Sequence, residues 1–285
     1  MSNLKVLIVL LLPLYLCMES CGQKGSRNVA FFKDTRAYEL AKAVERGALQ
    51  KIQELVSQDS TLLIVTNTVS GSNVLTLCLY VEQFESFKKL LELGADPNSI
   101  NSYDKYSILI DAIKYFGTQF EWREDYRYAE LLLEYGADPN YVVEDSFTNE
   151  RGSYVMASSP LMKASAMNLE LVKTLIEYGA DPYRKQGAKQ LTPFGSAIRA
   201  TQFEIIYYFI DSLEVDIYQP ITVRSKDSIF IQDYIVDKRM LKIIRAEESS
   251  VIDTVGNEEK WKLIEYLESK GVDFVNYKYK FYQDK

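Results

Sequence analysis

Histidine is absent from all 285 residues of this chain. Its absence excludes Ser-His-Asp and Cys-His nucleophiles and every zinc site that uses imidazole ligands. Cysteine is scarce: Cys17 and Cys21 lie near the N-terminus, and Cys78 is the only other one. Because one internal thiol forms neither a cysteine zinc site nor a disulfide framework, we expect Cys78 to be a small buried side chain.

Signatures for phosphate and calcium binding are also missing. Neither G-x-x-x-x-G-K-[ST] nor G-x-G-x-x-G occurs, and there is no acidic calcium loop. The chain has 33 lysines and arginines against 40 aspartates and glutamates, which gives a net charge of −7. Because nucleic-acid binding needs a basic surface, the sequence predicts no nucleic-acid partner, and it predicts no cofactor or metal.

The first residues form a short apolar segment behind Lys5. Its apolar run, residues 6–16, fits a secretory signal and is too short to span a membrane. With a cysteine just beyond, the segment resembles a bacterial lipoprotein signal, in which a small residue precedes the lipid-modified cysteine. Ser20 meets this requirement for Cys21, whereas Leu16 does not meet it for Cys17. Cys21 is therefore preferred over Cys17, with ordinary signal cleavage or an uncleaved anchor as alternatives.

The lipoprotein resemblance implies a cellular location. Residues 1–20 would be the signal peptide and residues 21–34 a polar tether. Gly22 stands where proteins retained at the inner membrane often carry aspartate, so the resemblance favours the outer membrane. The chain would then be lipid-anchored in the cell envelope and would face the periplasm or the exterior.

A short motif recurs further along the chain. Gly-Ala-Asp-Pro-Asn at residues 94–98 returns at 136–140, and Gly-Ala-Asp-Pro-Tyr stands at 179–183. Each copy follows an apolar helix ending, where glycine can take the left-handed conformation that closes a helix. The proline then prevents the helix from continuing. Self-similarity of this kind predicts stacked helix pairs joined by turns.

The opposite helix boundary has its own signal. Ser159 and Thr192 each precede a proline, so a hydroxyl side chain can cap the next helix while proline occupies its first position. With these boundaries the chain resembles the ankyrin-repeat family, whose signature runs from T-P-L to G-A-D-P-N. The resemblance implies an all-α ankyrin-repeat solenoid of helix pairs with hairpin fingers, about five to six units including degenerate caps.

The repeat domain is expected to cover residues 35–275, followed by a tail at 276–285. The glycines at 94, 136 and 179 are further apart than the family unit of about 33 residues. Insertions near 116–127 and 141–158 account for the excess length.

Weaker units flank the three clear copies. Residues 37–58 are expected to form a capping helix pair, residues 192–216 a fourth repeat, and residues from about 228 a divergent last unit with Trp261 on its apolar helix stripe. Aromatic residues at helical spacing are expected in the core, namely Phe84, Phe87, Tyr207 and Phe209.

Other aromatic residues fall in turns and insertions, where they can anchor a protein interface. The candidate partner-binding residues are Trp122, Tyr126, Tyr103, Tyr141, Phe147 and Tyr183. Packing against their own loops is the alternative interpretation for each of them. Acidic residues around Trp122 and Phe147 would favour a basic partner. The predicted function is non-catalytic binding of an unidentified protein by a monomer tethered to the membrane through its lipid.

Two other functions are considered. An acidic module with insertions suits an immunity or antitoxin-like inhibitor of a toxin delivered into the envelope. A carboxylate-dependent enzyme acting on glycans would use a pair of acids from the two insertions, where the candidates are Glu124, Asp125, Asp145 and Glu150. Solvated loops are the favoured explanation of these acids, because a chain with 40 acidic residues brings such neighbours together by chance, so the sequence predicts no enzyme.

Overall fold

The computed structural model describes residues 28–113, 126–224, 226–235, 254–274 and 276–277. The chain divides into two compact units. The first holds the residues up to Asp138 together with 149–152, and the second holds 139–148 and the residues from Ser153 onward. No helix in the described ranges has both the length and the apolar character needed to cross a membrane.

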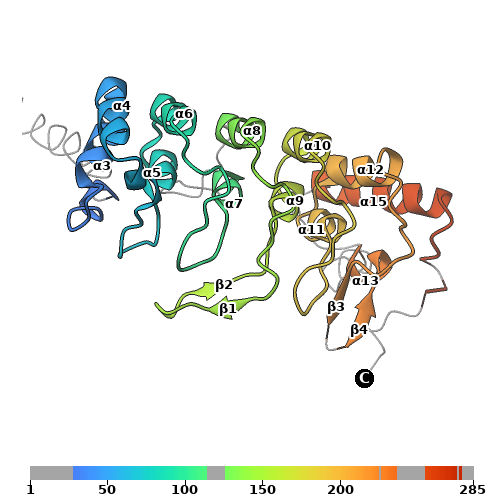
Figure 1. The fold of residues 1–285 in the computed structure, drawn as a ribbon. Coiled ribbons are helices and arrows are strands. Elements are labelled where there is room, and N and C mark those ends of the chain that lie inside the picture. The colour runs from blue at the N-terminus through green and yellow to red at the C-terminus, as the bar shows by residue number, and fades with distance from the viewer. Residues whose placement is uncertain (1–27, 114–125, 225, 236–253, 275, 278–285) are drawn as a thin grey trace, which may run out of the picture. The chain divides into compact units, whose positions relative to one another are not determined.

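The first unit is made of antiparallel helix pairs. Its elements are α3 (Tyr38–Glu45), α4 (Leu49–Gln58), the 3-10 helix η1 (Ser60–Ile64), α5 (Val74–Val81), α6 (Phe84–Glu92), α7 (Ile108–Ile113) and α8 (Arg127–Glu134). Within this unit α4, α6 and α8 form one layer, and α3, α5 and α7 form the other (Figure 1). The expected capping pair at 37–58 corresponds to α3 and α4.

The second unit repeats this arrangement and adds short strands. Its helices are α9 (Pro160–Ser165), α10 (Leu169–Glu177), α11 (Pro193–Arg199), α12 (Phe203–Asp211), α13 (Ile231–Ile235) and α15 (Thr254–Ser269). Two antiparallel hairpins pair β1 (Phe147–Thr148) with β2 (Tyr154–Val155) and β3 (Thr222–Arg224) with β4 (Asp227–Ile229). The described chain is therefore mostly helical, as an all-α repeat fold requires.

The helix ends follow the sequence signals. Gly94, Gly136 and Gly179 have φ angles of 90°, 87° and 87°, so each adopts the left-handed conformation at a helix end. Ser159 Oγ accepts a hydrogen bond from the Met162 N–H at 3.3 Å, with a proline at the start of α9. The cap predicted at Thr192 is present in the same form and is shorter, at 2.9 Å. These predictions are confirmed.

The core is built from apolar residues at helical spacing. Leu171, Val172 and Leu175 of α10 are buried, and so are Ile205, Ile206, Phe209 and Ile210 of α12. Cys78 is a buried free thiol, as predicted. Burial of this apolar surface is the main favourable contribution to stability of such helix pairs.

Three aromatic residues lie nearer the surface than predicted. Phe87 and Phe209 are buried, but Phe84 and Tyr207 are only partly covered. Both Phe84 and Tyr207 contact another aromatic ring edge to face. Phe84 meets Tyr128 with ring centroids 5.1 Å apart. The Trp261 side chain is 43% exposed, so its assignment to the apolar stripe of α15 was wrong. Residues 263, 264 and 267 already fill the buried side of that helix.

Candidate protein-binding face

The last residue of the Gly-Ala-Asp-Pro-Asn motif, four positions after the glycine, forms hydrogen bonds with the turn of the next repeat. In the second unit Asn140 Nδ2 donates to the carbonyl oxygen of Gly179 at 2.8 Å, and Asn140 Oδ1 accepts from the Asp181 N–H at 2.8 Å. Asn98 makes the same two bonds inside the first unit, at 3.1 and 2.7 Å. Asparagine suits this position because its amide has a donor and an acceptor side by side. The asparagine of the motif therefore links one turn to the next.

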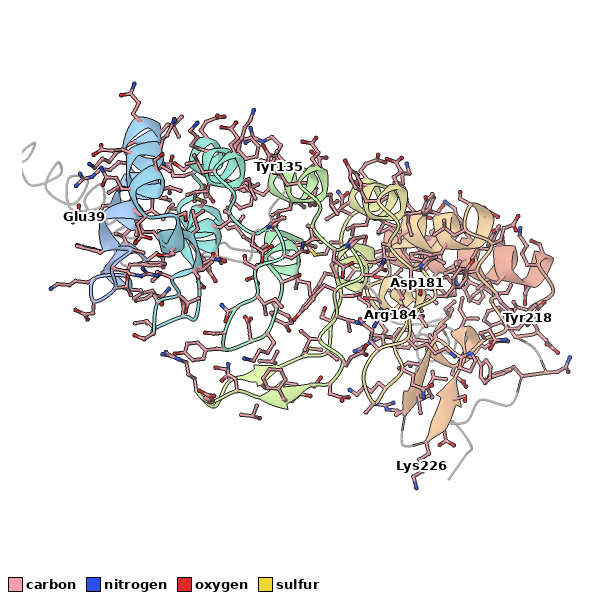
Figure 2. The ribbon with its side chains drawn as sticks, in the orientation of Figure 1. Glu39, Tyr135, Asp181, Arg184, Tyr218 and Lys226 are labelled. Carbon is pink, nitrogen blue, oxygen red and sulfur yellow. The ribbon has the colours of Figure 1, made fainter. Side chains whose placement is uncertain are left out.

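Tyrosine takes over this linking position later in the second unit. The Tyr183 hydroxyl donates to the carbonyl oxygen of Leu213 at 2.7 Å. The hydroxyl of Tyr218, which is labelled in Figure 2, donates to the carbonyl oxygen of Lys270 at 2.9 Å. Both side chains nevertheless remain exposed, by 56% for Tyr183 and 54% for Tyr218. The hydroxyl of Tyr183, a predicted partner-binding residue, thus has a partner inside the protein, while its ring remains accessible.

The hairpin of β1 and β2 has two different sides. Phe147 pairs with Val155 and Thr148 with Tyr154 in antiparallel register. Val155 is buried and Phe147 partly so, which places the packed side of the hairpin on this pair. Side chains alternate along a strand, so the other side carries Tyr154, and Met156 follows with the same parity. Their exposed fractions are 69% and 53%.

The turn at residues 186–191 lies against the base of this hairpin. A side chain added at Gly187 would come within 3.0 Å of the Ala157 side chain. Arg184 forms an ion pair with Glu144 at 2.7 Å, so one of the acidic groups near Phe147 already has a cationic partner. Gln186 is buried, and neither polar atom of its amide has a hydrogen-bond partner in the described structure.

The hairpin of β3 and β4 continues the series. The Lys189 carbonyl oxygen accepts hydrogen bonds from the Val223 N–H at 2.6 Å and from the Thr222 hydroxyl at 2.8 Å. The turn at 186–191 therefore lies between the two hairpins of the second unit. We call the exposed surface of residues 144–148, 153–157, 183–191, 222–224 and 226–229 the finger face.

Tyr103 and Tyr126 belong to the first unit. The Tyr103 hydroxyl donates to the carbonyl oxygen of Thr68 at 2.8 Å, and the guanidinium of Arg151 lies 4.3 Å from the centre of its ring. Arg151 also bonds to the same Thr68 oxygen. Tyr126 is partly exposed and immediately precedes α8. Tyr103 is thus engaged in local packing, which was the alternative interpretation for this residue.

The remaining predicted residues differ in their accessibility. Tyr141 and Phe147 are partly exposed in the second unit. Asp145 and Glu150 are exposed, and no group of acidic or thiol side chains in the described ranges could hold a metal ion. Several predictions lie outside the described residues, namely those for Trp122, Glu124, Asp125, Cys17 and Cys21.

Sequence reasoning missed much of the finger face. Met156 and the lysines at 185, 189 and 226 were not recognised as candidates. All three lysines are exposed, and Lys226 is in the turn of the second hairpin (Figure 2). The available signal was strand-like alternation, with Tyr154 and Met156 flanking Val155 and with Thr222 and Arg224 flanking Val223.

Comparison with known proteins supports the repeat assignment for part of the chain. No match was found among curated proteins. A family model described as ankyrin repeats (many copies) matches residues 161–210, which run from α9 through most of α12. This segment carries the confirmed cap at Thr192 and the turn at Gly179. The match supports assignment of these helix pairs to the ankyrin-repeat family.

Proposed function

We propose that this chain is a non-catalytic protein-binding module and that the finger face is its binding surface. Ankyrin repeats generally mediate protein–protein interaction. The exposure of Tyr154 and Met156 on one side of a paired hairpin is the observation that carries the proposal for this face. Large apolar side chains gathered on an exposed surface are typical of an interface, because their burial by a partner is favourable.

The hairpin is suited to present these side chains. Strand pairing and the contact of Ala157 with the turn at 186–191 hold its backbone in place. A preorganised backbone reduces the entropy lost on binding. Tyrosine adds a large contact area with few rotatable bonds, and methionine adapts to irregular surfaces. We therefore infer that Tyr154 and Met156 anchor the partner.

A capture experiment tests the binding face. The full-length chain is crosslinked in its native cells beside a Tyr154→Ala/Met156→Ala variant. The matched control is Ile64→Ala/Tyr135→Ala, which removes two exposed apolar side chains of the first unit. Truncation of two anchor residues costs about 2–4 kcal/mol, or roughly 30-fold or more in affinity. A protein that is lost only from the finger variant supports the proposal, and equal recovery from all three chains contradicts it. A toxin as the captured protein would identify the immunity function.

The cellular location is a separate proposal that depends on the sequence alone. An apolar run at 6–16 followed by Ser20 and Cys21 supports a lipid anchor on Cys21 in the cell envelope. Mass spectrometry of the mature N-terminus should find a lipid-modified cysteine at residue 21. Cys21→Ala should abolish the modification, whereas Cys17→Ala should preserve it. An unmodified N-terminus at another residue would contradict the anchor.

A further inference from the structure

We propose that the partner presents an acidic segment that binds to Lys185, Lys189 and Lys226 of the finger face. The inference rests on the proposed function and adds the chemistry of the partner to it. All three side chains are exposed, and the structure gives none of them a carboxylate partner among the described residues. On a chain with a net charge of −7, such a group of cations is not expected from composition.

The backbone brings these lysines to neighbouring turns. Lys185 directly precedes the short turn in which Gln186 pairs with Leu191, and Lys189 lies within it. The carbonyl oxygen of Lys189 bonds to the N–H of Val223, which fixes this turn beside β3. Lys226 is in the β3–β4 turn with a φ of 77°, and its side chain projects away from both strands (Figure 2).

One of the acids near these lysines is already paired with another cation, since Glu144 binds Arg184. Asp227 lies opposite Arg224 in the hairpin register, and Asp145 is exposed. Helical lysines behave differently, since many form ion pairs with carboxylates on their own helix, among them Lys42, Lys51, Lys89, Lys173 and Lys262. Across the described residues of the finger face, five basic side chains stand against three acidic ones, so this face keeps an excess of positive charge that a partner's carboxylates can neutralise.

The position of the lysines beside the hairpin favours an acidic protein segment that also carries apolar side chains. Gly187, between Lys185 and Lys189, approaches Ala157, which directly follows the exposed Met156. The turn that carries Lys189 therefore lies beside the end of the hairpin that carries Met156. Lysine ammonium groups are flexible point charges, which suits carboxylates at variable positions along an extended segment. This reverses the preference for a basic partner expected from the acids around Phe147.

Binding to synthetic peptides tests the sign of the charge. The probes are a fluorescein-labelled peptide of glutamates and phenylalanines and its counterpart with lysine at every glutamate. The variant is Lys185→Gln/Lys189→Gln/Lys226→Gln in the full-length chain, and the control is Lys33→Gln/Arg46→Gln/Lys88→Gln, which changes net charge equally at exposed sites elsewhere. Fluorescence anisotropy should show roughly tenfold weaker binding of the glutamate peptide by the finger variant, with little change in the control. The difference should shrink in high salt.

Three outcomes would overturn the inference. Equal affinity for the two peptides would show that charge does not select the partner. An equal loss in both triple variants would show that net charge alone matters. Tighter lysine-dependent binding to phosphatidylglycerol vesicles than to the glutamate peptide would assign the lysines to a lipid surface. If the captured protein is lost with Tyr154→Ala/Met156→Ala but retained by the lysine variant, the proposed function stands and only the acidic segment is excluded.

Discussion

Replacing Asn140 by alanine tests whether the side chain after each turn glycine holds neighbouring turns together. The substitution removes the bond to the Gly179 carbonyl oxygen and the bond from the Asp181 N–H, both 2.8 Å long. A hydrogen bond contributes about 0.5–1.5 kcal/mol net, because water replaces part of its energy when it is lost. Since Asn140 is partly exposed, we expect the free energy of unfolding to fall by about 1–2 kcal/mol.

Urea unfolding followed by circular dichroism measures this change. The control is a substitution at a side-chain amide that makes no such hydrogen bonds. Gln53 is exposed on α4, so Gln53→Ala should alter the free energy of unfolding by less than about 0.5 kcal/mol. Hydrogen exchange adds a local measurement. The Asp181 amide should exchange faster in Asn140→Ala, whereas the Asp138 amide should exchange faster in Asn98→Ala, because each asparagine accepts from only one of them.

Two results together would refute a stabilising role of the Asn140 side chain. Asn140→Ala and Gln53→Ala would change the free energy of unfolding equally, and the Asp181 amide would exchange at its original rate. That result would mean that water satisfies the two turn groups at no cost. Faster exchange at Asp138 and Asp181 in both asparagine variants would instead indicate a general loosening rather than two separate links.

Three further predictions concern single side chains in the described structure. Gln186→Met should raise the free energy of unfolding by about 1–2 kcal/mol in urea titrations, because the buried amide has no hydrogen-bond partner; destabilisation would show that the amide is satisfied. Burial raises the pKa of the Cys78 thiol, so in a Cys17→Ser/Cys21→Ser chain Ellman's reagent should react with Cys78 at mildly alkaline pH only after urea unfolding; rapid reaction of the folded chain would contradict its burial. The Tyr266 hydroxyl and the Lys270 ammonium lower the pKa of Asp211 below its ordinary value of 3.8, so this stabilisation is complete above that value and is lost as the pH falls through the lowered pKa. The stability difference between wild type and Tyr266→Phe should therefore narrow below about pH 4, and a constant difference in acid would exclude the Asp211 contact as its source.

The features that sequence predicted best are those fixed by local backbone chemistry. Gly94, Gly136 and Gly179 take positive φ because a helix end requires it, and Thr192 caps α11 because a hydroxyl before proline satisfies a free N–H. Neither feature depends on contacts with residues distant in sequence. These signals specified where helices begin and end, and therefore the repeated helix pairs.

Exposure of individual aromatic residues could not be read in this way, because it depends on neighbours distant in sequence. Tyr183 has an accessible ring, but its hydroxyl reaches Leu213 in the following repeat. Trp261 occupies a position of helical periodicity, yet the residues that follow it fill the buried side of α15. Periodicity assigns a face to a helix, and the width of the buried part of that face is set by the packing partner.

The repeat chemistry also explains why specificity would concentrate on the finger face. A motif residue such as Asn140 must serve the next turn, and the buried side of each helix must match its neighbour, so both are constrained by packing. The exposed side of the finger face is less constrained by packing. Tyr154, Met156 and the three lysines there present apolar surface and positive charge to solvent. Exposed side chains that contribute little to folding are the ones free to select a partner.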